Sequence, residues 1–202
     1  MAKKREPVQG GDGATDAGLM LRVQRGDTGA LNVLYERWNR PILHFFYHMG
    51  VDRDRAEDGM QEVFLRLLKS AKHYRPIGKF STYLFQIAKN YWFNERGKIR
   101  RAGRPFSGLA PAGGVDSTAG AMQFPDSTAG PRTRAINEEM DFRVRDAVQG
   151  LSEPLRVVFV LSTYEGMKYE EIGEVLGIPV GTVKSRMSKA MEALEQRLRK
   201  YT

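Results

Sequence analysis

The stretch YEEIGEVLGIPVGTVKSR, residues 169–186, decides the fold of the second half of the chain. About nine residues at helical apolar spacing lead to Gly177, a residue type that adopts the left-handed conformation ending many helices. A short connector at 178–180 follows, and a long helix is predicted from Gly181 onward. Two helices joined by so short a turn predict a helix-turn-helix. Gly173, which has no side chain, lets the second helix cross closely over the first.

The long helix of this motif has an apolar side and a basic side. Its predicted inward positions are Val183, Met187, Ala190, Met191 and Leu194. The outward positions hold Lys, Arg, Ser and Thr, which donate hydrogen bonds to phosphates and to base edges. The first turns of a recognition helix enter the major groove of DNA, and an ordinary hairpin with a solvated basic face is the alternative. The predicted DNA contacts are Thr182, Lys184, Ser185, Arg186, Ser188 and Lys189.

The basic residues gather in two separate parts of the chain, whose net charge is +8. Residues 72–104 contain nine Lys or Arg and one Glu, and residues 180–200 contain six Lys or Arg and two Glu. Two clusters favour two contacts with a polyanion such as a nucleic acid. The lack of Cys excludes a disulfide framework, and no apolar run is long enough for a membrane helix or a signal peptide. We expect a cytoplasmic protein with no membrane insertion.

A stretch of low complexity divides the chain into two parts. In residues 103–137, 22 of 35 positions are Gly, Pro, Ser, Thr or Ala, and DSTAG occurs at both 116–120 and 126–130. This composition buries too little apolar surface to offset the entropy of ordering, so a flexible linker is predicted. The predicted organisation is a disordered arm at 1–14, a helical domain at 15–102, the linker at 103–137 and a second helical domain at 138–202.

The first part reads as helices throughout, without strand alternation. Apolar residues recur at helical spacing from Thr28 to Phe46, with Pro41 a predicted kink or break. The predicted fold class is all-α, with two small helical domains joined by a flexible linker and a helix-turn-helix in the second. The apolar stripes of the next two helices are Ala56, Met60, Val63, Phe64, Leu67 and Leu68, and then Phe80, Leu84, Ile87, Ala88 and Tyr91.

Three motifs, in order and on both sides of the predicted linker, resemble the extracytoplasmic-function (ECF, group 4) sigma factors of the sigma-70 family. AEDGMQEVFLR at 56–66 looks like their domain 2 helix, which binds the clamp of RNA polymerase. FSTYLFQIAKN at 80–90 looks like the next helix, which meets the −10 element, and PVGTVKSR at 179–186 is similar to domain 4, which reads the −35 element. The resemblance implies an alternative sigma factor that binds core RNA polymerase and directs promoter-specific initiation.

The resemblance also implies roles for particular residues. An acidic and amide-bearing face would bind the clamp helices of core polymerase, through Glu57, Asp58, Gln61, Glu62 and Arg66. A loop and a basic, aromatic helix would capture flipped −10 bases and line the path of the melted strand. Those residues are Tyr74, Arg75, Lys79, Lys89, Asn90, Arg96, Lys98, Arg100 and Arg101. Promoter DNA, the polymerase flap and an anti-sigma protein are the further implied partners. The chain departs from the family where Tyr83 stands in place of Trp and where Lys168 stands in place of a Ser or Thr N-cap.

Two other classes of function remain as alternatives. A helix-turn-helix regulator that is not a polymerase subunit would need a sensor or receiver domain in front, and the first part shows only helices. A metal-dependent nuclease could use His44 and His48, four residues apart on one helix, or Glu57, Asp58 and Glu62, but no further ligand falls at a useful spacing. We therefore expect no catalytic residue, metal, cofactor or small-molecule substrate, and no enzyme activity.

Overall fold

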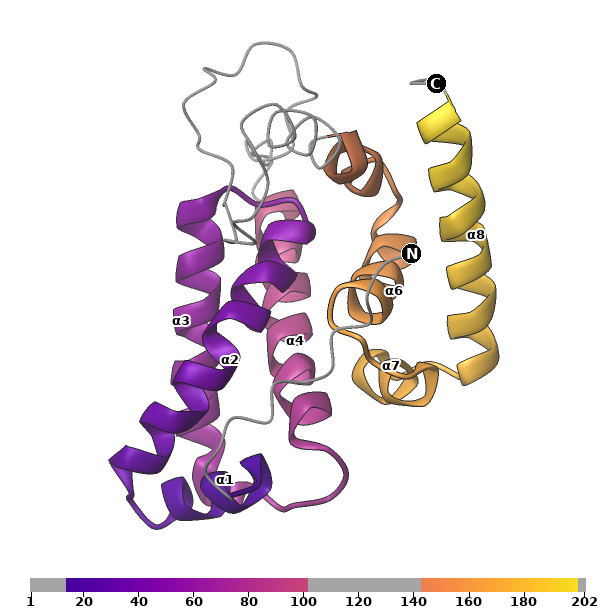
Figure 1. Ribbon diagram of the computed structural model, residues 1–202. Coiled ribbons are helices and arrows are strands. Elements are labelled where there is room, and N and C mark those ends of the chain that lie inside the picture. The colour runs from indigo at the N-terminus through magenta and orange to yellow at the C-terminus, as the bar shows by residue number, and fades with distance from the viewer. Residues whose placement is uncertain (1–13, 102–142, 200–202) are drawn as a thin grey trace, which may run out of the picture.

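The computed structural model describes residues 14–101 and 143–199, and every regular element within these ranges is a helix (Figure 1). The helices form a first domain within residues 14–101 and a second within 143–199. The prediction of an all-α fold with a C-terminal helix-turn-helix is therefore confirmed. The predicted arm (apart from Ala14), the linker at 103–137 and the boundary at 138 lie outside the described residues.

The first domain begins its helices at polar capping residues. The side chains of Thr15, Asp27 and Asp52 each accept a backbone hydrogen bond of 2.9–3.1 Å from the residue three positions on. Each bond satisfies an N–H group that has no partner inside the helix, which is why these residue types favour the N-cap. The elements of this domain are α1 (Asp16–Gln24), α2 (Thr28–His48), α3 (Arg53–Ser70), the 3-10 turn η1 (Ala71–His73) and α4 (Phe80–Arg101).

Helix α2 runs without interruption through Pro41, so of the kink or break predicted there, the break does not occur. A proline inside a helix removes one backbone hydrogen bond and crowds the preceding turn. Here the residues on both sides of Pro41 are fixed by packing, since Leu34 precedes it and Ile42 and Phe45 follow it in the core. Tertiary packing against α1 and α3 therefore outweighs the local cost.

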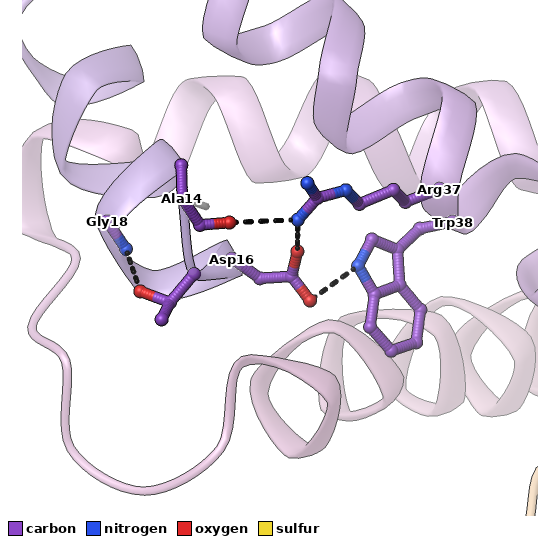
Figure 2. A network of polar contacts seen from close by, with 6 residues as sticks. Ala14, Asp16, Gly18, Arg37 and Trp38 are labelled. Atoms are coloured by element: carbon purple, nitrogen blue, oxygen red, sulfur yellow. Dashed lines mark hydrogen bonds and ion pairs between the residues drawn. The ribbon is translucent and has the colours of Figure 1, made fainter. Parts of the chain in front are cut away.

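A polar network fastens α1 to α2 (Figure 2). The Asp16 carboxylate accepts hydrogen bonds from Arg37 Nη1 at 2.8 Å and from Trp38 Nε1 at 3.1 Å. Arg37 Nη1 also donates to the Ala14 carbonyl at 3.1 Å. The indole and the guanidinium thus keep their donors satisfied while the Trp38 ring packs edge-on against Phe85.

Helix α4 is buried on two sides. Leu84, Phe85 and Ala88 lie in the core of the first domain, and the Phe85 ring contacts Phe45 with 5.8 Å between centroids. Trp92 is only 3% exposed, and its indole nitrogen bonds to a residue of the second domain. The predicted single stripe therefore missed Phe85 and Trp92, because a helix between two neighbours needs a wider apolar surface than one stripe.

The second domain is built around α6, which is apolar on nearly all sides. Residues 143–149 are helical, and α6 (Glu153–Thr163) follows after Ser152, its N-cap residue. Val157, Val158 and Leu161 are buried between the other helices. The remaining elements are α7 (Tyr169–Leu176) and α8 (Val180–Leu198).

The turn between α7 and α8 has the predicted geometry. Gly177 ends α7 in the left-handed conformation with φ at +67°. A Cβ on Gly173 would lie 3.0 Å from the carbonyl oxygen of Ile178, so only glycine permits this close approach of the connector. At the start of α7, Glu171 accepts a bond from the Lys168 backbone N–H at 3.1 Å, which replaces part of the missing side-chain cap.

Two residues predicted to be inward are exposed. Leu68 on α3 is 47% exposed and Met191 on α8 is 52% exposed. Both lie at the edge of their predicted stripe, where a hydrophobic residue at helical spacing faces solvent because no neighbouring helix covers it. The other members of those two stripes are buried or partly buried.

The two domains pack against each other along α4. Helix α4 contacts α7, and the C-terminal end of α2 contacts α6. Helix α8 packs on α6 and α7, on the side away from α4 (Figure 1). This interface was not predicted from the sequence. It determines where the candidate site residues lie.

Candidate nucleic-acid interface

The recognition helix α8 presents its basic residues to solvent. Lys184, Ser185, Ser188 and Lys189 are exposed, while Thr182 and Arg186 are partly buried. Ser185 Oγ donates to the Thr182 carbonyl at 3.0 Å, which leaves its lone pairs free to accept. Within the described residues, neither Lys184 nor Lys189 forms an ion pair with an acidic side chain, so their charges are available to a polyanion. All six predicted residues share one end of α8.

A five-residue loop at 75–79 connects η1 to α4 and is exposed throughout. Its backbone folds tightly, since the Ile77 N–H donates to the Arg75 carbonyl at 2.7 Å and Gly78 has φ at +77°. Ile77 is 83% exposed between Pro76 and Gly78, so an apolar side chain stands at the tip of a loop with a cation at each end. Ile77 was not predicted as a site residue. Its position between a proline and a glycine, outside any helical apolar stripe, is the signal that could have indicated it.

Tyr74 precedes this loop and has a different environment from the one expected. Its ring is 6% exposed and packs on Phe80 and Tyr83, with centroids 6.3 and 5.2 Å away. Burial raises the pKa of its hydroxyl. In this structure the ring anchors the loop and is not open to a base. Tyr83 packs as expected and shares a 2.7 Å hydrogen bond with Ser70 Oγ.

The polar residues of α4 divide between solvent and the second domain. Asn90 and Lys98 are exposed, and Lys98 pairs with Glu95 at 2.7 Å. Arg96 lies over the Trp92 ring, 5.4 Å from its centroid, and pairs with Glu153 of the second domain at 3.6 Å. Arg101 is exposed and donates to the Gly97 carbonyl at 3.1 Å, while the side chain of Arg100 lies outside the described part of the chain.

A hollow of about 390 Å³ lies between the two domains. Lys89 and Asn90 of α4 line one wall, and Arg186 of α8 lies on the other. Partial burial lowers the pKa of Lys89. The structure therefore brings predicted −10 residues and one predicted −35 residue to the same space. The apolar lining comes from Phe93, Pro154, Val157, Leu176 and Ile178.

The acidic face of α3 is the side of the helix that faces away from the core of the first domain. Asp58 and Gln61 are exposed, whereas Glu62 is paired with Arg66 at 2.8 Å and Glu57 with Arg53 at 2.8 Å. The predicted five residues therefore share one helix. Two exposed leucines missed by the sequence analysis, Leu65 and Leu68, continue the line of Asp58 and Gln61 at helical spacing.

Of the two histidines weighed as metal ligands, His48 lies at the domain interface. His48 stacks on Tyr164 of the second domain, with centroids 3.6 Å apart and planes 9° apart. Burial, followed by the nearby His44, lowers the pKa of His48 to about 4. Residues 14–101 and 143–199 contain no group of three His, Cys, Asp or Glu able to hold a metal ion. None of the helices they form is long and apolar enough to cross a membrane.

Two family models match the chain, one over most of each domain. The family described as "Sigma-70 region 2" matches residues 34–104, and "Sigma-70, region 4" matches residues 141–194. The RNA polymerase sigma-H factor of Pseudomonas aeruginosa is 32% identical over 91% of this chain and 93% of its own length. The ECF RNA polymerase sigma-E factor of Escherichia coli K12 is 29% identical over 91% of this chain and 94% of its own length.

Solved structures share the fold. CnrH, in complex with the cytosolic domain of CnrY, superposes with a TM-score of 0.67 at 21% identity, covering 93% of this chain and 99% of that chain. RpoE from Bartonella quintana, in complex with the anti-sigma factor NepR, gives 0.65 at 19% identity, covering 83% and 96%. With both conserved regions matched in order and a relative 32% identical over most of the chain, the chain belongs to the extracytoplasmic-function sigma factors of the sigma-70 family.

Proposed function

We propose that the three surfaces act as three contacts of one initiation complex, in which the chain guides polymerase and catalyses nothing itself. The face of α3 binds the clamp helices of core RNA polymerase, the loop at 75–79 and α4 hold the melted −10 strand, and α8 reads the −35 major groove. The observation that carries this assignment is the exposed basic face on the first turns of α8, the second helix of the helix-turn-helix, where Lys184 and Lys189 form no ion pair within the described residues. The chain works in the cytoplasm, where polymerase and promoters are.

The polymerase contact combines charge with apolar area. Asp58 and Gln61 supply polar groups that specify the partner, and Leu65 and Leu68 supply exposed apolar surface on the same line of α3. Interfaces gain most of their affinity from a few such apolar anchors, while charges steer association. A basic or mixed helical surface on the polymerase clamp fits this combination, and the flap is the proposed partner of the second domain.

The DNA contacts divide between duplex and single strand. On α8, Lys184 and Arg186 are placed to donate to guanine edges or phosphates, and Ser185 and Ser188 to phosphates. On the first domain, Arg75 and Lys79 flank Ile77 in the loop, and Lys89, Asn90 and Arg96 follow along α4. Such a series of cations beside aromatic rings suits a single strand.

An anti-sigma protein is the further proposed partner. RpoE of Bartonella quintana is a sigma factor in complex with the anti-sigma factor NepR, and CnrH is in complex with the cytosolic domain of CnrY. A regulator of this kind would act by covering one or more of the three surfaces.

The test is reconstitution with core polymerase. The purified chain is added to core enzyme free of other sigma factors, and transcripts are mapped on genomic DNA from the source organism. We expect a small set of start sites absent from core alone, and direct binding to core. The absence of both would overturn the proposal.

A further inference from the structure

We propose that the hollow between the two domains is a binding site for a free nucleoside monophosphate. The hollow has a volume of about 390 Å³, and its walls come from α4 of the first domain and from α6, α7 and α8 of the second. Sites for small molecules are mostly apolar cavities of about 300–1,000 Å³ with a few converging polar groups. The inference goes beyond the proposed function and does not depend on it, because it concerns a small ligand and neither polymerase nor a promoter.

The charged residues that line the hollow are two cations. Lys89 lies on α4 and Arg186 on α8, so each domain contributes one. Among residues 14–101 and 143–199, neither side chain forms a hydrogen bond or an ion pair. Burial lowers the pKa of Lys89, and no carboxylate counters this effect. An anion in the hollow would compensate both cations for the solvation that they lose there.

The nearest carboxylate along the chain is bound elsewhere. Glu153 precedes Pro154, which lines the hollow, but its carboxylate accepts a hydrogen bond from Trp92 at 2.9 Å and pairs with Arg96 at 3.6 Å. The lining therefore keeps its positive charge. A phosphate monoester carries a charge of about −1.5 to −2 at pH 7, which matches two cations better than the single charge of a carboxylate does. Lys and Arg bind phosphate oxygens through charge-assisted hydrogen bonds.

The remaining groups on the α4 side suit a nucleobase. Asn90 and Asn94 offer amide donors and acceptors, and neither has a partner in the part of the chain that the structure describes. Asparagine amides pair with base edges, and bases stack on aromatic rings. Phe93 lies between the two amides in the sequence, is 38% exposed and contacts no other aromatic ring of the described residues. The second domain adds apolar area through Leu176 and Ile178.

A nucleotide within a DNA strand has similar chemistry, since Lys89, Asn90 and Arg186 are also proposed DNA contacts. A strand, however, must continue out of the hollow on both sides, and each of its phosphates carries a single charge. The free monophosphate ends inside the hollow and brings the larger charge to the two cations. The experiments below distinguish the two sources.

The first test measures affinity for the whole ligand and for its parts. AMP, GMP, CMP and UMP are titrated into the full chain by isothermal titration calorimetry, beside the matching nucleosides and inorganic phosphate. We expect at least one monophosphate to bind about tenfold or more tightly than either of its parts, because only the whole ligand reaches both the cations and the amides. Absence of binding up to about 1 mM, or binding no tighter than that of inorganic phosphate, would overturn the inference.

Matched substitutions test the location. Arg186→Met and Lys184→Met each remove one cation from α8, but only Arg186 lines the hollow. Asn94→Asp and Gln61→Glu each turn an exposed amide into a carboxylate, the first in the hollow and the second on α3. The two hollow variants should bind the monophosphate about tenfold more weakly, and the controls should stay within about twofold because distant exposed charges are screened. Equal losses in the variants and their controls would contradict the site.

A photoaffinity probe locates the ligand directly. The azido derivative of the monophosphate that binds is irradiated with the full chain, and tryptic peptides are analysed by mass spectrometry. The peptide at 90–96 contains Asn90, Phe93 and Asn94, and the peptide at 169–184 contains Leu176 and Ile178. Label on either peptide that excess unlabelled nucleotide prevents would support the site. Label on neither would overturn it.

A last measurement separates the free ligand from a strand and this inference from the proposed function. Binding of a fluorescein-labelled DNA single strand is compared in the unchanged chain and in Arg186→Met. If the substitution weakens strand binding while no monophosphate binds, the hollow serves a strand only and the inference is wrong. Failure of the proposed function would instead appear as a chain that binds the monophosphate but neither binds core polymerase nor starts transcription.

Discussion

Helices α8 and α4 both carry basic residues that we propose as DNA contacts, yet they differ in what surrounds these residues. The first half of α8 faces solvent with Lys184 and Lys189 free of ion pairs among the described residues. Helix α4 lies between the domains, with Phe85 in one core, Trp92 bonded to Glu153, and Arg96 paired across the interface. The basic residues of α8 are therefore open to solvent, whereas those of α4 share their surroundings with the second domain.

The largest expected effect distinguishes the two faces of α4. Phe85→Ala should lower the free energy of unfolding by about 3–5 kcal/mol, because it leaves a cavity among Phe45 and Trp38. Phe93→Ala, at a side chain that lines the hollow between the domains and is 38% exposed, should lower it by no more than about 1 kcal/mol. Chemical denaturation of both variants measures the difference, and similar losses would show that Phe93 is more deeply packed than described.

Next in size is the removal of the free cations of α8. Lys184→Ala with Arg186→Ala should reduce −35-dependent transcription on the order of 100-fold, since each base or phosphate contact is worth about 1–3 kcal/mol. Binding to core polymerase should remain. Arg199→Ala, at the far end of α8 and paired with Glu195, is the matched control. Equal losses in both proteins would place the DNA contact elsewhere.

The interface between the two domains should respond to acid through His48. Burial lowers the pKa of His48 from 6.5 to about 4, so the folded chain favours the neutral ring. Below pH 6.5 the unfolded chain binds the proton more readily, and stability should fall progressively toward pH 4, by about 2 kcal/mol at pH 5. His48→Phe keeps the stack on Tyr164 and removes the proton site. The gap between the two denaturation curves should change between pH 7 and pH 5; parallel behaviour would contradict the depressed pKa.

The smallest expected effect concerns the exposed leucines of α3. Leu65→Ala with Leu68→Ala should leave thermal stability nearly unchanged, because both side chains are about half exposed. Affinity for core polymerase should drop about tenfold, as for the loss of an apolar anchor at an interface. Lys69→Ala, exposed on the same helix, is the control. Unchanged affinity would limit the contact to the polar residues of α3.

The contrast between α8 and α4 also explains what the sequence could predict. The helix-turn-helix depends on local signals, a left-handed glycine, a close approach at Gly173 and a basic face, and each is present in the structure. The break at Pro41 was wrong because packing of Leu34, Ile42 and Phe45 outweighs the local cost. Phe85 is buried against Phe45, about 40 residues away in the sequence, and Trp92 bonds to Glu153, about 60 residues away. Helical periodicity does not report contacts over such separations.

The candidate site was predicted unevenly for the same reason. Residue types and motif order located the loop at 75–79, α4 and the polar face of α3, but not their environments. Tyr74 is buried, and Lys79 and Arg96 meet carboxylates of the other domain, because burial and pairing are decided by the packing of the two domains. Ile77 and Leu65 were not singled out and Leu68 was predicted to face inward, since exposure of an apolar side chain has no mark in the sequence.

The double burial of α4 has an evolutionary consequence. A helix that packs on one core, touches a second domain and also contacts DNA has few positions where a substitution is neutral, and a change that suits one neighbour disturbs another. Among relatives, α4 should therefore diverge slowly and through paired changes with α6 and α7. The outer faces of α3 and α8 are each proposed to bind a single partner, so their sequences can change together with the sequence of that partner. New promoter preferences should arise first on α8 and in the loop at 75–79, where a substitution disturbs the least of the fold.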